Sequence, residues 1–318
     1  ALYVLARNKK ASVGDLRYYV DTKLEPFTSP MAVAQLAASL ALYGDALKSA
    51  KRALTLAEAA GDDMLVANLH EERGMAYEQL GLPGDALQSY GGARPVYERI
   101  EGKDGPAAGN LLLNMGNALD GLARHEDAIT AYRRSLAIIS RHHGPESTSA
   151  AYLHINIGWS LAQLKRYDEG YDASATGYDI LRRKTGPGAD KIAYVLNNMG
   201  IIREWQGRHR EAIALNLKSL VIYERFQDIT LAPKRWALRS LANSYAALGQ
   251  KQAAILFAKL AVNTHQKIRS LNTGLDQGHA SALTDSWRTI YTGLADMLVG
   301  EGRIAEAQYV LNLLKQQE

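Results

Sequence analysis

The sequence has no cysteine and no long apolar run. Without cysteine the chain has no internal disulfide, no thiolate metal ligand and no cysteine nucleophile. No apolar stretch approaches the roughly 20 residues that a membrane-spanning helix needs. The start of the chain also lacks the charged segment, apolar stretch and cleavage site of a signal peptide. These last two absences predict a cytoplasmic protein with no membrane partner.

The sequence also has little excess of either charge sign, and it has few proline and phenylalanine residues. Lys and Arg (37) barely exceed Asp and Glu (33), and both signs are interspersed along the chain. Nucleic-acid binders usually concentrate positive charge on one face or in one run, so we expect no nucleic-acid partner. Ala and Leu dominate, and both lose little side-chain freedom in a helix. Runs of Val, Ile and Thr between turn residues are missing, which favours an all-α fold.

The length of the chain bears on its domain organisation. The 318 residues, 47% of them apolar, exceed the roughly 250–300 residues at which a single core stops growing. The chain is therefore either two domains or a solenoid. Because it begins at Ala1 and not at Met, we expect a fragment or a processed form.

A regular internal repeat favours the solenoid. Four similar strings, from LHEERGMAYEQLG to LNNMGIIREWQG, each carry a glycine, and one further step reaches an alanine. These small residues recur at a constant step of 42 positions: Gly74, Gly116, Gly158, Gly200 and Ala242. A second small residue follows each of them by 12 positions: Ala86, Ala128, Gly170, Ala212 and Ala254.

Each repeat is interpreted as two antiparallel helices joined by a short turn, with the small residues where the two helices cross. A larger side chain there would push the axes apart, and overpacking costs roughly 1–3 kcal/mol. For the repeat around Gly200 we predict helices over about Ile192–Gln206 and His209–Arg225. Gly and Pro in the linkers end the helices, and the pair Asp62-Asp63 is interpreted as a helix cap.

In four repeats a large residue follows the first small one by three positions. The repeat around Gly200 has Arg203 there, so its packing is left open. This pattern resembles the tetratricopeptide repeat, which implies an all-α, right-handed α-α superhelix, the TPR solenoid. The 42-residue period and the Gly-Pro linkers look more like the subclass of kinesin light chains and many bacterial multi-repeat proteins. The resemblance covers roughly residues 64–265, and the large residues are Tyr77, Leu119, Leu161 and Tyr245.

Both ends of the chain depart from the 42-residue period, so we predict that the chain has three parts. Residues 1–63 form N-terminal helices with an irregular repeat, 64–270 form five 42-residue repeats, and 271–318 form an insertion plus a C-terminal repeat. The first 45 residues faintly resemble helices of the thioester-containing domain of bacterial alpha-2-macroglobulins. The closing string, ending VLNLLKQQE, resembles the last repeat before a caspase-like (CHAT-type) peptidase domain, which would follow Glu318.

Three asparagines lie two residues before the glycines, at identical spacing: Asn114, Asn156 and Asn198. An asparagine amide offers both a donor and an acceptor, so it can pair with an extended peptide backbone whatever the peptide's side chains. Each such bond contributes roughly 1 kcal/mol. The resemblance supports this interpretation, because peptide-binding tetratricopeptide domains commonly carry a backbone-clamping asparagine here. Alternatively, these residues cap or bridge neighbouring helices.

Aromatic residues and further asparagines recur at other positions of the first helices. Aromatic side chains combine large contact area with few rotamers, which suits binding hot spots. The alternative is that they pack between repeats. The repeat around Gly74 is instead acidic, with Glu71, Glu72 and Glu78. The other residues predicted to bind a peptide are Asn110, Asn117, Tyr152, Trp159, Tyr194, Asn197, Trp205, Trp236 and Asn243.

No pattern typical of catalysis or metal binding stands out. His142-His143 lies in a loop with too few further ligands, and His70-Glu71-Glu72 lacks the second histidine of a metalloprotease helix. We therefore predict no enzymatic activity, no cofactor and no metal.

The predicted function is a scaffold that binds an extended peptide or a partner protein in a groove lined by the first helices. A sharper version makes it the sensor or regulatory region of a CHAT-type multidomain protein. The alternative is a structural module that self-associates through its outer face or its ends.

Overall fold

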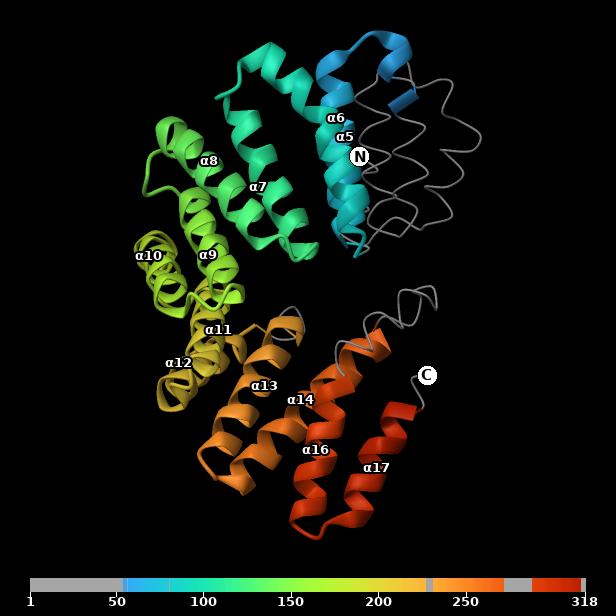
Figure 1. Cartoon of the computed structure of the whole chain (residues 1–318), viewed down its shortest axis with the longest axis vertical. Helices are drawn as coiled ribbons and strands as arrows, with labels where there is room; N and C mark the ends of the chain where they lie inside the picture. The colour runs from blue at the N-terminus through green and yellow to red at the C-terminus, as the bar shows by residue number, and fades with distance from the viewer. Residues whose placement is uncertain (1–53, 56, 80, 227–230, 272–287, 316–318) are drawn as a thin grey trace. The chain divides into compact units, whose positions relative to one another are not determined.

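The computed structural model describes residues 54–55, 57–79, 81–226, 231–271 and 288–315 (Figure 1). Throughout these residues the regular secondary structure is α-helix. The all-α prediction from composition is therefore confirmed. The helices predicted near the N-terminus lie outside the described residues, and so do residues 272–287, which hold most of the insertion predicted within 271–318.

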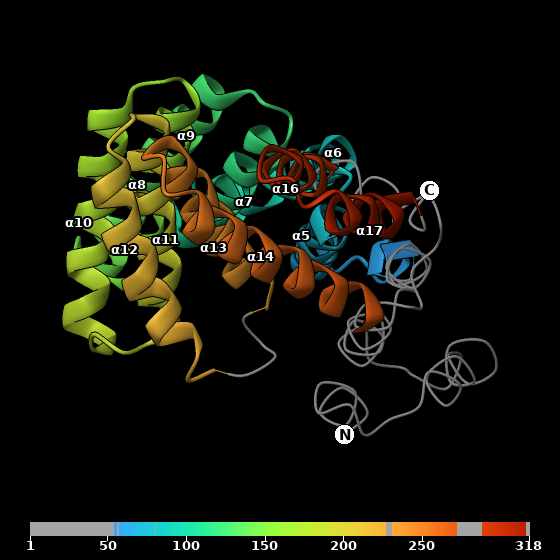
Figure 2. The same cartoon turned by 90° about the horizontal axis from the view of Figure 1, so that it is seen from below.

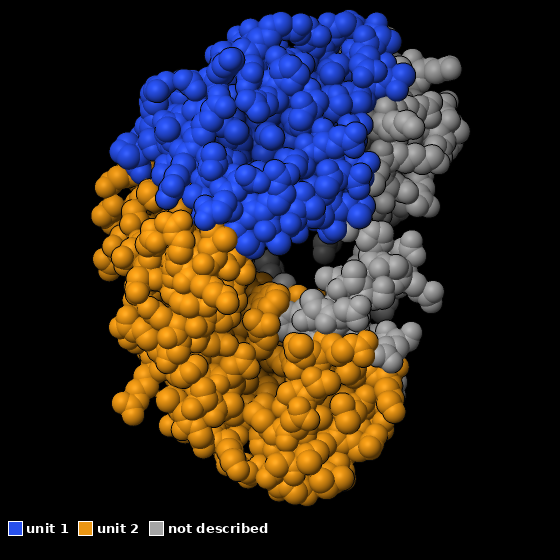
Figure 3. Space-filling view, viewed as in Figure 1, with its two compact units in different colours: residues 1–145 blue, residues 146–318 orange. Residues whose placement is uncertain are grey.

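The chain divides into two compact units, Ala1–Pro145 and Glu146–Glu318 (Figure 3). Described helices of the first unit are α5 (Asp63–Gln79), α6 (Pro83–Glu101), α7 (Pro106–Gly121) and α8 (His125–His143). Described helices of the second unit are α9 (Thr148–Gln163), α10 (Tyr167–Thr185), α11 (Asp190–Trp205), α12 (His209–Tyr223), α13 (Leu231–Ala247), α14 (Lys251–Leu271), α16 (Arg288–Gly300) and α17 (Ile304–Lys315).

Successive helices pack as hairpins: α5 with α6 and α7 with α8 in the first unit, then α9 with α10, α11 with α12, α13 with α14 and α16 with α17 in the second (Figures 1 and 2). We call the first helix of each hairpin its A helix and the second its B helix. The hairpin predicted around Gly200 is confirmed, since α11 and α12 match the expected ranges to within two residues. None of the described helices is both long enough and apolar enough to cross a bilayer.

The helix ends follow the predicted local chemistry. The carboxylate of Asp62 accepts a hydrogen bond from the backbone N–H of Leu65 at 3.0 Å, which confirms the predicted cap of α5. Gly102, Gly144 and Gly186 directly follow the B helices α6, α8 and α10. Each has a φ of 83–85°, a left-handed conformation that glycine adopts without a steric penalty, so the linker glycines end these helices as predicted.

The small residues lie where the helices cross, and each glycine has a specific partner. A Cβ on Gly116 would lie 2.4 Å from the ring of Tyr132, and one on Gly74 would lie 2.3 Å from the ring of Tyr90. At Gly158 the Cβ would meet backbone atoms of the B helix, with the carbonyl oxygen of Gly170 at 2.5 Å. The predicted crossing is confirmed. What the repeat analysis missed is the side chain of the B helix that faces each glycine.

Arg203, the departure from the repeat pattern, packs as a large residue through its flat guanidinium. The side chain is buried, and its Cζ lies 3.5 Å from the centre of the Tyr171 ring. It also donates to the side chain of Gln206 and pairs with the carboxylate of Glu211 at 3.3 Å. A planar cation stacked on an aromatic ring fills the space that leucine or tyrosine fills elsewhere.

Candidate functional site

The candidate site lies on the A helices of the second unit, where α11 packs against both α9 and α13. We call the surface formed there by the predicted aromatic and asparagine residues the A-helix face. It lies within one compact unit. Its predicted members are Tyr152, Asn156 and Trp159 on α9, Tyr194, Asn197, Asn198 and Trp205 on α11, and Trp236 and Asn243 on α13.

Two of the predicted tryptophans come together between neighbouring A helices. The ring centres of Trp159 and Trp205 lie 5.3 Å apart, with 46° between the ring planes. This tilted arrangement falls within the favourable range for aromatic pairs. Both side chains are half-buried, so each still offers part of its surface to solvent. The pair therefore serves packing between hairpins and provides an apolar surface at the same time.

Two predicted tyrosines lie on the same two helices. Tyr194 is 42% exposed, which makes it the most accessible aromatic residue of the A-helix face. Tyr152 is half-buried, and the ammonium of Lys191 lies 5.8 Å from its ring centre. Burial raises the pKa of Tyr152, and the neighbouring Lys191 offsets part of that rise. Tyr152 is therefore neutral at physiological pH.

Trp236 lies beside two arginines of its own helix. The guanidinium carbons of Arg239 and Arg235 lie 4.5 Å and 5.7 Å from the centre of the Trp236 ring. Burial lowers the pKa of Arg239, while burial and the charge of Arg239 lower that of Arg235 to about 10. Both arginines are cations at pH 7, so α13 contributes positive charge to the A-helix face.

A hydrogen bond from Asn243 to Glu204 links α13 to α11. The amide nitrogen of Asn243 donates to Oε1 of Glu204 at 2.7 Å. Burial raises the pKa of the Glu204 carboxyl, and its hydrogen bonds and the nearby charge of Arg239 offset part of that rise. Asn243 itself is exposed, so it bridges two helices while keeping contact with solvent.

The raised pKa of Glu204 predicts a pH-dependent effect of Glu204→Gln. Because folding favours the protonated carboxyl, ionised Glu204 lowers the free energy of unfolding as the pH rises above the unfolded-state pKa of about 4.3. Glutamine keeps an acceptor for Asn243 without the charge. We expect Glu204→Gln to raise the free energy of unfolding at pH 7, and the gain to vanish below about pH 4. Urea denaturation at both pH values measures this.

Glu306→Gln is a control whose effect on the free energy of unfolding should have the opposite sign. Hydrogen bonds from Arg303 and Lys259 lower the pKa of Glu306 to about 2, so its ionised form stabilises the fold at neutral pH. The control variant should lose stability at pH 7. If Glu204→Gln raised stability equally at pH 3 and pH 7, ionisation of Glu204 would not be the cause.

The three asparagines of α9 and α11 differ in accessibility. Asn156 is half-buried, whereas Asn198 is 6% exposed. Asn197 is 2% exposed and donates to the side-chain oxygen of Asn216 on α12 at 2.8 Å. The amide of Asn216 in turn donates to the hydroxyl of Ser240 on α13 at 2.9 Å. Asn197 therefore belongs to a buried polar network that joins three helices.

The remaining predicted asparagines lie on α7, in the first unit. Asn110 is exposed. Asn114 donates to Oε1 of Glu71 on α5 at 2.8 Å, so it bridges neighbouring A helices. Asn117 accepts a hydrogen bond from the hydroxyl of Tyr132 on its own hairpin at 2.8 Å. The ladder Asn114–Asn156–Asn198 thus spans both units, and its peptide-binding role stays a prediction.

The acidic residues of α5 largely serve the first unit itself. Glu71 accepts from the hydroxyl of Tyr97 at 2.8 Å, and Glu78 accepts from that of Tyr90 at 3.0 Å. Burial raises the pKa of both carboxyls, and these hydrogen bonds counteract the rise. The acidic patch expected from the sequence is therefore partly internal. Among the described residues, no three His, Asp or Glu side chains cluster as metal ligands would.

Sequence reasoning missed Arg239 and Glu204 as members of the A-helix face. Their importance comes from α11 and α13 lying side by side, which brings the buried carboxylate of one helix near the guanidinium of the other. A local signal did exist. Arg235 and Arg239 are four residues apart with Trp236 between them, so one turn of helix places both cations beside the ring.

Paired helices, small residues at their crossings and a regular period define the class of α-helical hairpin solenoids. Within that class, the sequence model of the Tetratricopeptide repeat family matches residues 65–141 and 191–267, just under half of the chain. The chain therefore contains tetratricopeptide repeats, as the resemblance of its repeat pattern implied. A search of the curated proteins found no match.

Solved structures with the same fold include proteins from several systems. BtubC (BKLC) from P. vanneervenii is 19% identical over 72% of this chain and 92% of its own, with a TM-score of 0.59. A Rap protein in complex with Competence and Sporulation Factor is 14% identical over 99% and 95%, with a TM-score of 0.63. Aspartyl phosphate phosphatase F from Bacillus subtilis is 13% identical over 99% and 91%, with a TM-score of 0.58. At these identities the likeness concerns the fold alone.

Proposed function

We propose that this protein is an interaction scaffold that binds an extended peptide or a partner protein through its A-helix face. The observation that carries the proposal is the set of accessible aromatic residues on adjacent A helices, with Tyr194 42% exposed and the Trp159–Trp205 pair half-buried. Aromatic side chains on a rigid helical surface are typical binding hot spots. Asn156 and Asn243 add amide groups that can pair with a peptide backbone.

The shared fold with a Rap protein solved with Competence and Sporulation Factor supports this proposal, since a scaffold of this kind can hold a ligand. The mixture of Arg239, Glu204 and asparagine side chains beside the tryptophans adds polar groups that would orient a ligand. Polar groups around an apolar anchor are the usual arrangement at binding sites.

Removal of both tryptophans tests the proposal. We expect Trp159→Ala/Trp205→Ala to lower partner recovery at least about 10-fold in a pull-down from an extract of the source organism, because hot-spot aromatics contribute about 2 kcal/mol or more. Asn156→Ala should lower recovery less, by about 1 kcal/mol or roughly 5-fold. Recovery is measured by quantitative mass spectrometry, with circular dichroism to check folding.

Leu248→Ala is the matched control for this experiment. Leu248 is 37% exposed in the turn between α13 and α14, outside the A-helix face, so its removal should leave recovery unchanged. If the double tryptophan variant, still folded, recovered the same partners in the same amounts, the A-helix face would not be the binding surface.

Three narrower statements stay proposals. The sensor role beside a caspase-like (CHAT-type) domain depends on the resemblance of the closing string, and the gene sequence after the Glu318 codon tests it. A cytoplasmic location is tested by fractionation of the source cells. The absence of enzymatic activity depends on the lack of a catalytic pattern and is tested by activity screening of the purified chain.

A further inference from the structure

The guanidinium of Arg239 on α13 has no hydrogen-bond acceptor and no ion-pair partner among the described residues. Its Nε is fully buried, but the side chain as a whole is only half-buried, so its terminal nitrogens can reach solvent. The Trp236 ring, whose centre lies 4.5 Å from the guanidinium carbon, supports the group on one side. Withdrawing a charged group from water without pairing it is costly, which indicates that a ligand completes the pairing.

Glu204 on α11 is the carboxylate whose charge acts on Arg239, but the two groups do not pair. Oε1 of Glu204 accepts a hydrogen bond from the amide of Asn243 at 2.7 Å, and Oε2 is buried without a donor. Neither oxygen lies within hydrogen-bond or ion-pair distance of the Arg239 guanidinium. The terminal donors of Arg239 therefore stay available although a carboxylate is near.

The repeat register shows that side chains at the position of Arg239 usually serve the fold. The corresponding residues of the preceding repeats are Glu71, Leu113, Ile155 and Asn197. Ile155 is fully buried, and Asn197 donates to Asn216 at 2.8 Å. Glu71 accepts hydrogen bonds from two side chains of its own unit. Arg239 departs from this pattern, because its terminal nitrogens donate to none of the described residues.

A second guanidinium, that of Arg235, lies against the same tryptophan ring. Its carbon lies 5.7 Å from the centre of the Trp236 ring, and its Nη1 lies 3.1 Å from Nδ1 of His265. Burial and then the charge of Arg239 lower the pKa of Arg235 to about 10, so the two cations repel each other at neutral pH. Helix α13 itself contains no Asp or Glu. An anion beside Trp236 would offset this repulsion, whereas a cation would add to it.

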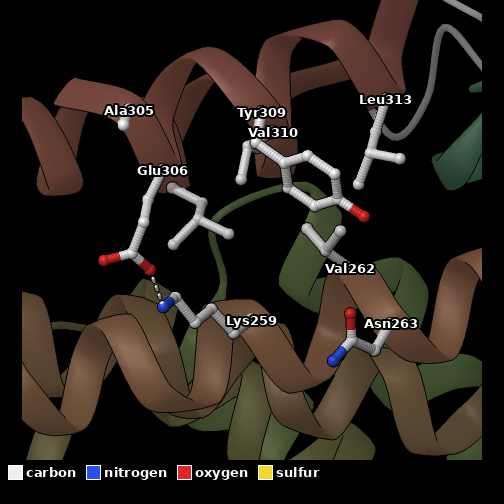
Figure 4. Close-up of a pocket in the computed structure, with 9 residues that line it drawn as sticks. Lys259, Val262, Asn263, Ala305, Glu306, Tyr309, Val310 and Leu313 are labelled. Atoms are coloured by element: carbon white, nitrogen blue, oxygen red, sulfur yellow. Dashed lines mark hydrogen bonds and ion pairs between the residues drawn. The ribbon is translucent and has the colours of Figure 1, made fainter. Parts of the chain in front are cut away.

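Two lysines of the same unit differ from Arg239, because each is paired within the chain. A groove of about 350 Å³ lies between α14 and α17, beside Tyr309 (Figure 4). Figure 4 shows that Lys259 of α14 forms an ion pair there with Glu306 of α17. On α13, Lys234 pairs with Glu224 of α12. The charges of these lysines are matched, so they attract an anion less than Arg239 does.

We propose that Arg239 binds an Asp or Glu side chain of the extended peptide, whose two carboxylate oxygens accept from the two terminal nitrogens. This inference rests on the proposed function, because the A-helix face must hold the rest of the peptide. A guanidinium and a carboxylate match as two parallel, charge-assisted hydrogen bonds. A phosphoryl group would bring more negative charge toward Glu204 and is typically bound by a cluster of arginines, so the site favours a carboxylate.

Random 12-residue peptides, displayed and selected on the intact chain, test the proposal. Peptides are kept when Trp159→Ala/Trp205→Ala weakens their binding, which restricts them to the A-helix face. We expect them to share an Asp or Glu at one position. By fluorescence anisotropy, Arg239→Gln should lower their affinity at least about 10-fold. Arg239→Lys keeps the charge but not the paired donors, so it should lower affinity less. Glu204→Gln should raise affinity, because it removes a repelling charge.

A double-mutant cycle separates direct pairing from a structural role of Arg239. Replacing the shared acid of the peptide by its amide should lower affinity at least about 10-fold for the intact protein but little for Arg239→Gln. Arg225→Gln, which removes an exposed arginine just after α12, is the matched control and should leave affinity unchanged. The inference is overturned, while the proposed function stands, if the kept peptides share no acid or the cycle is additive. It is also overturned if a phosphoserine version binds more tightly than the acidic peptide. If no peptide depends on the two tryptophans, the proposed function fails, and this inference fails with it.

Discussion

Gly158→Ala is expected to destabilise the second unit by about 2 kcal/mol or more, through overpacking of a helix crossing. The added methyl group would meet the carbonyl oxygen of Gly170 at 2.5 Å and the backbone nitrogen of Ser174 at 2.9 Å. Backbone atoms of a packed helix cannot rotate away, so α9 and α10 must separate. Overpacking of this kind costs about 3 kcal/mol or more where the backbone must shift, and the better helix propensity of alanine offsets about 1 kcal/mol of it. Urea denaturation followed by circular dichroism measures the change.

Gly293→Ala is the matched control, because it makes the same substitution inside a helix of the same unit. A Cβ at Gly293 would have no neighbouring atom within 4 Å, so only the helix-propensity gain applies. We expect it to raise the free energy of unfolding by about 0.5–1 kcal/mol. Equal effects of the two substitutions would show that close approach of α9 and α10 does not require glycine at 158.

Asn216→Leu is the second substitution with a large expected effect. It should lower the free energy of unfolding by about 2–4 kcal/mol, because it leaves buried polar groups unpaired. Asn216 is fully buried and holds hydrogen bonds with Asn197, with Ser240 and with the backbone carbonyl of Ala212. Leucine has a similar size but leaves the amide of Asn197 and the hydroxyl of Ser240 without this partner. Each buried group left unsatisfied costs about 1–3 kcal/mol. The midpoint and slope of urea denaturation report the loss.

The companion variant replaces the whole network. In Asn197→Leu/Asn216→Leu/Ser240→Ala no amide of the network is left unpaired, so stability should recover by at least half of the loss. This nonadditivity distinguishes unsatisfied hydrogen bonds from a simple packing defect. If the triple variant were less stable than Asn216→Leu alone by the sum of independent losses, the network interpretation would be wrong.

The fold was largely predictable because its packing rule is local and periodic. Close crossing of two helices requires small residues near the contact, so Gly116 and Ala128 reveal a hairpin, and the same pair of small positions recurs in each repeat. The same reasoning predicted α11 and α12 to within two residues. It did not predict the partner of each glycine, because a tyrosine ring or an asparagine at that point is seen only when the two helices face each other.

The candidate site was predictable only in part. The period correctly placed Trp159 and Trp205 on neighbouring A helices, where their rings meet. It also grouped Asn156 with Asn198, although one is half-buried and the other 6% exposed. Equal spacing specifies the same position on each helix. How closely the next hairpin covers that position depends on side chains of the neighbouring repeat.

The 42-residue period and the small residues at its crossings were sufficient to determine an all-α stack of hairpins, because backbone proximity allows few side chains at those points. The tertiary structure decided which polar residues remain accessible, since burial of Asn197 depends on α12 and α13 and not on its own helix. It also revealed the groove beside Tyr309, which exists because the side chains of two hairpins leave that space unfilled.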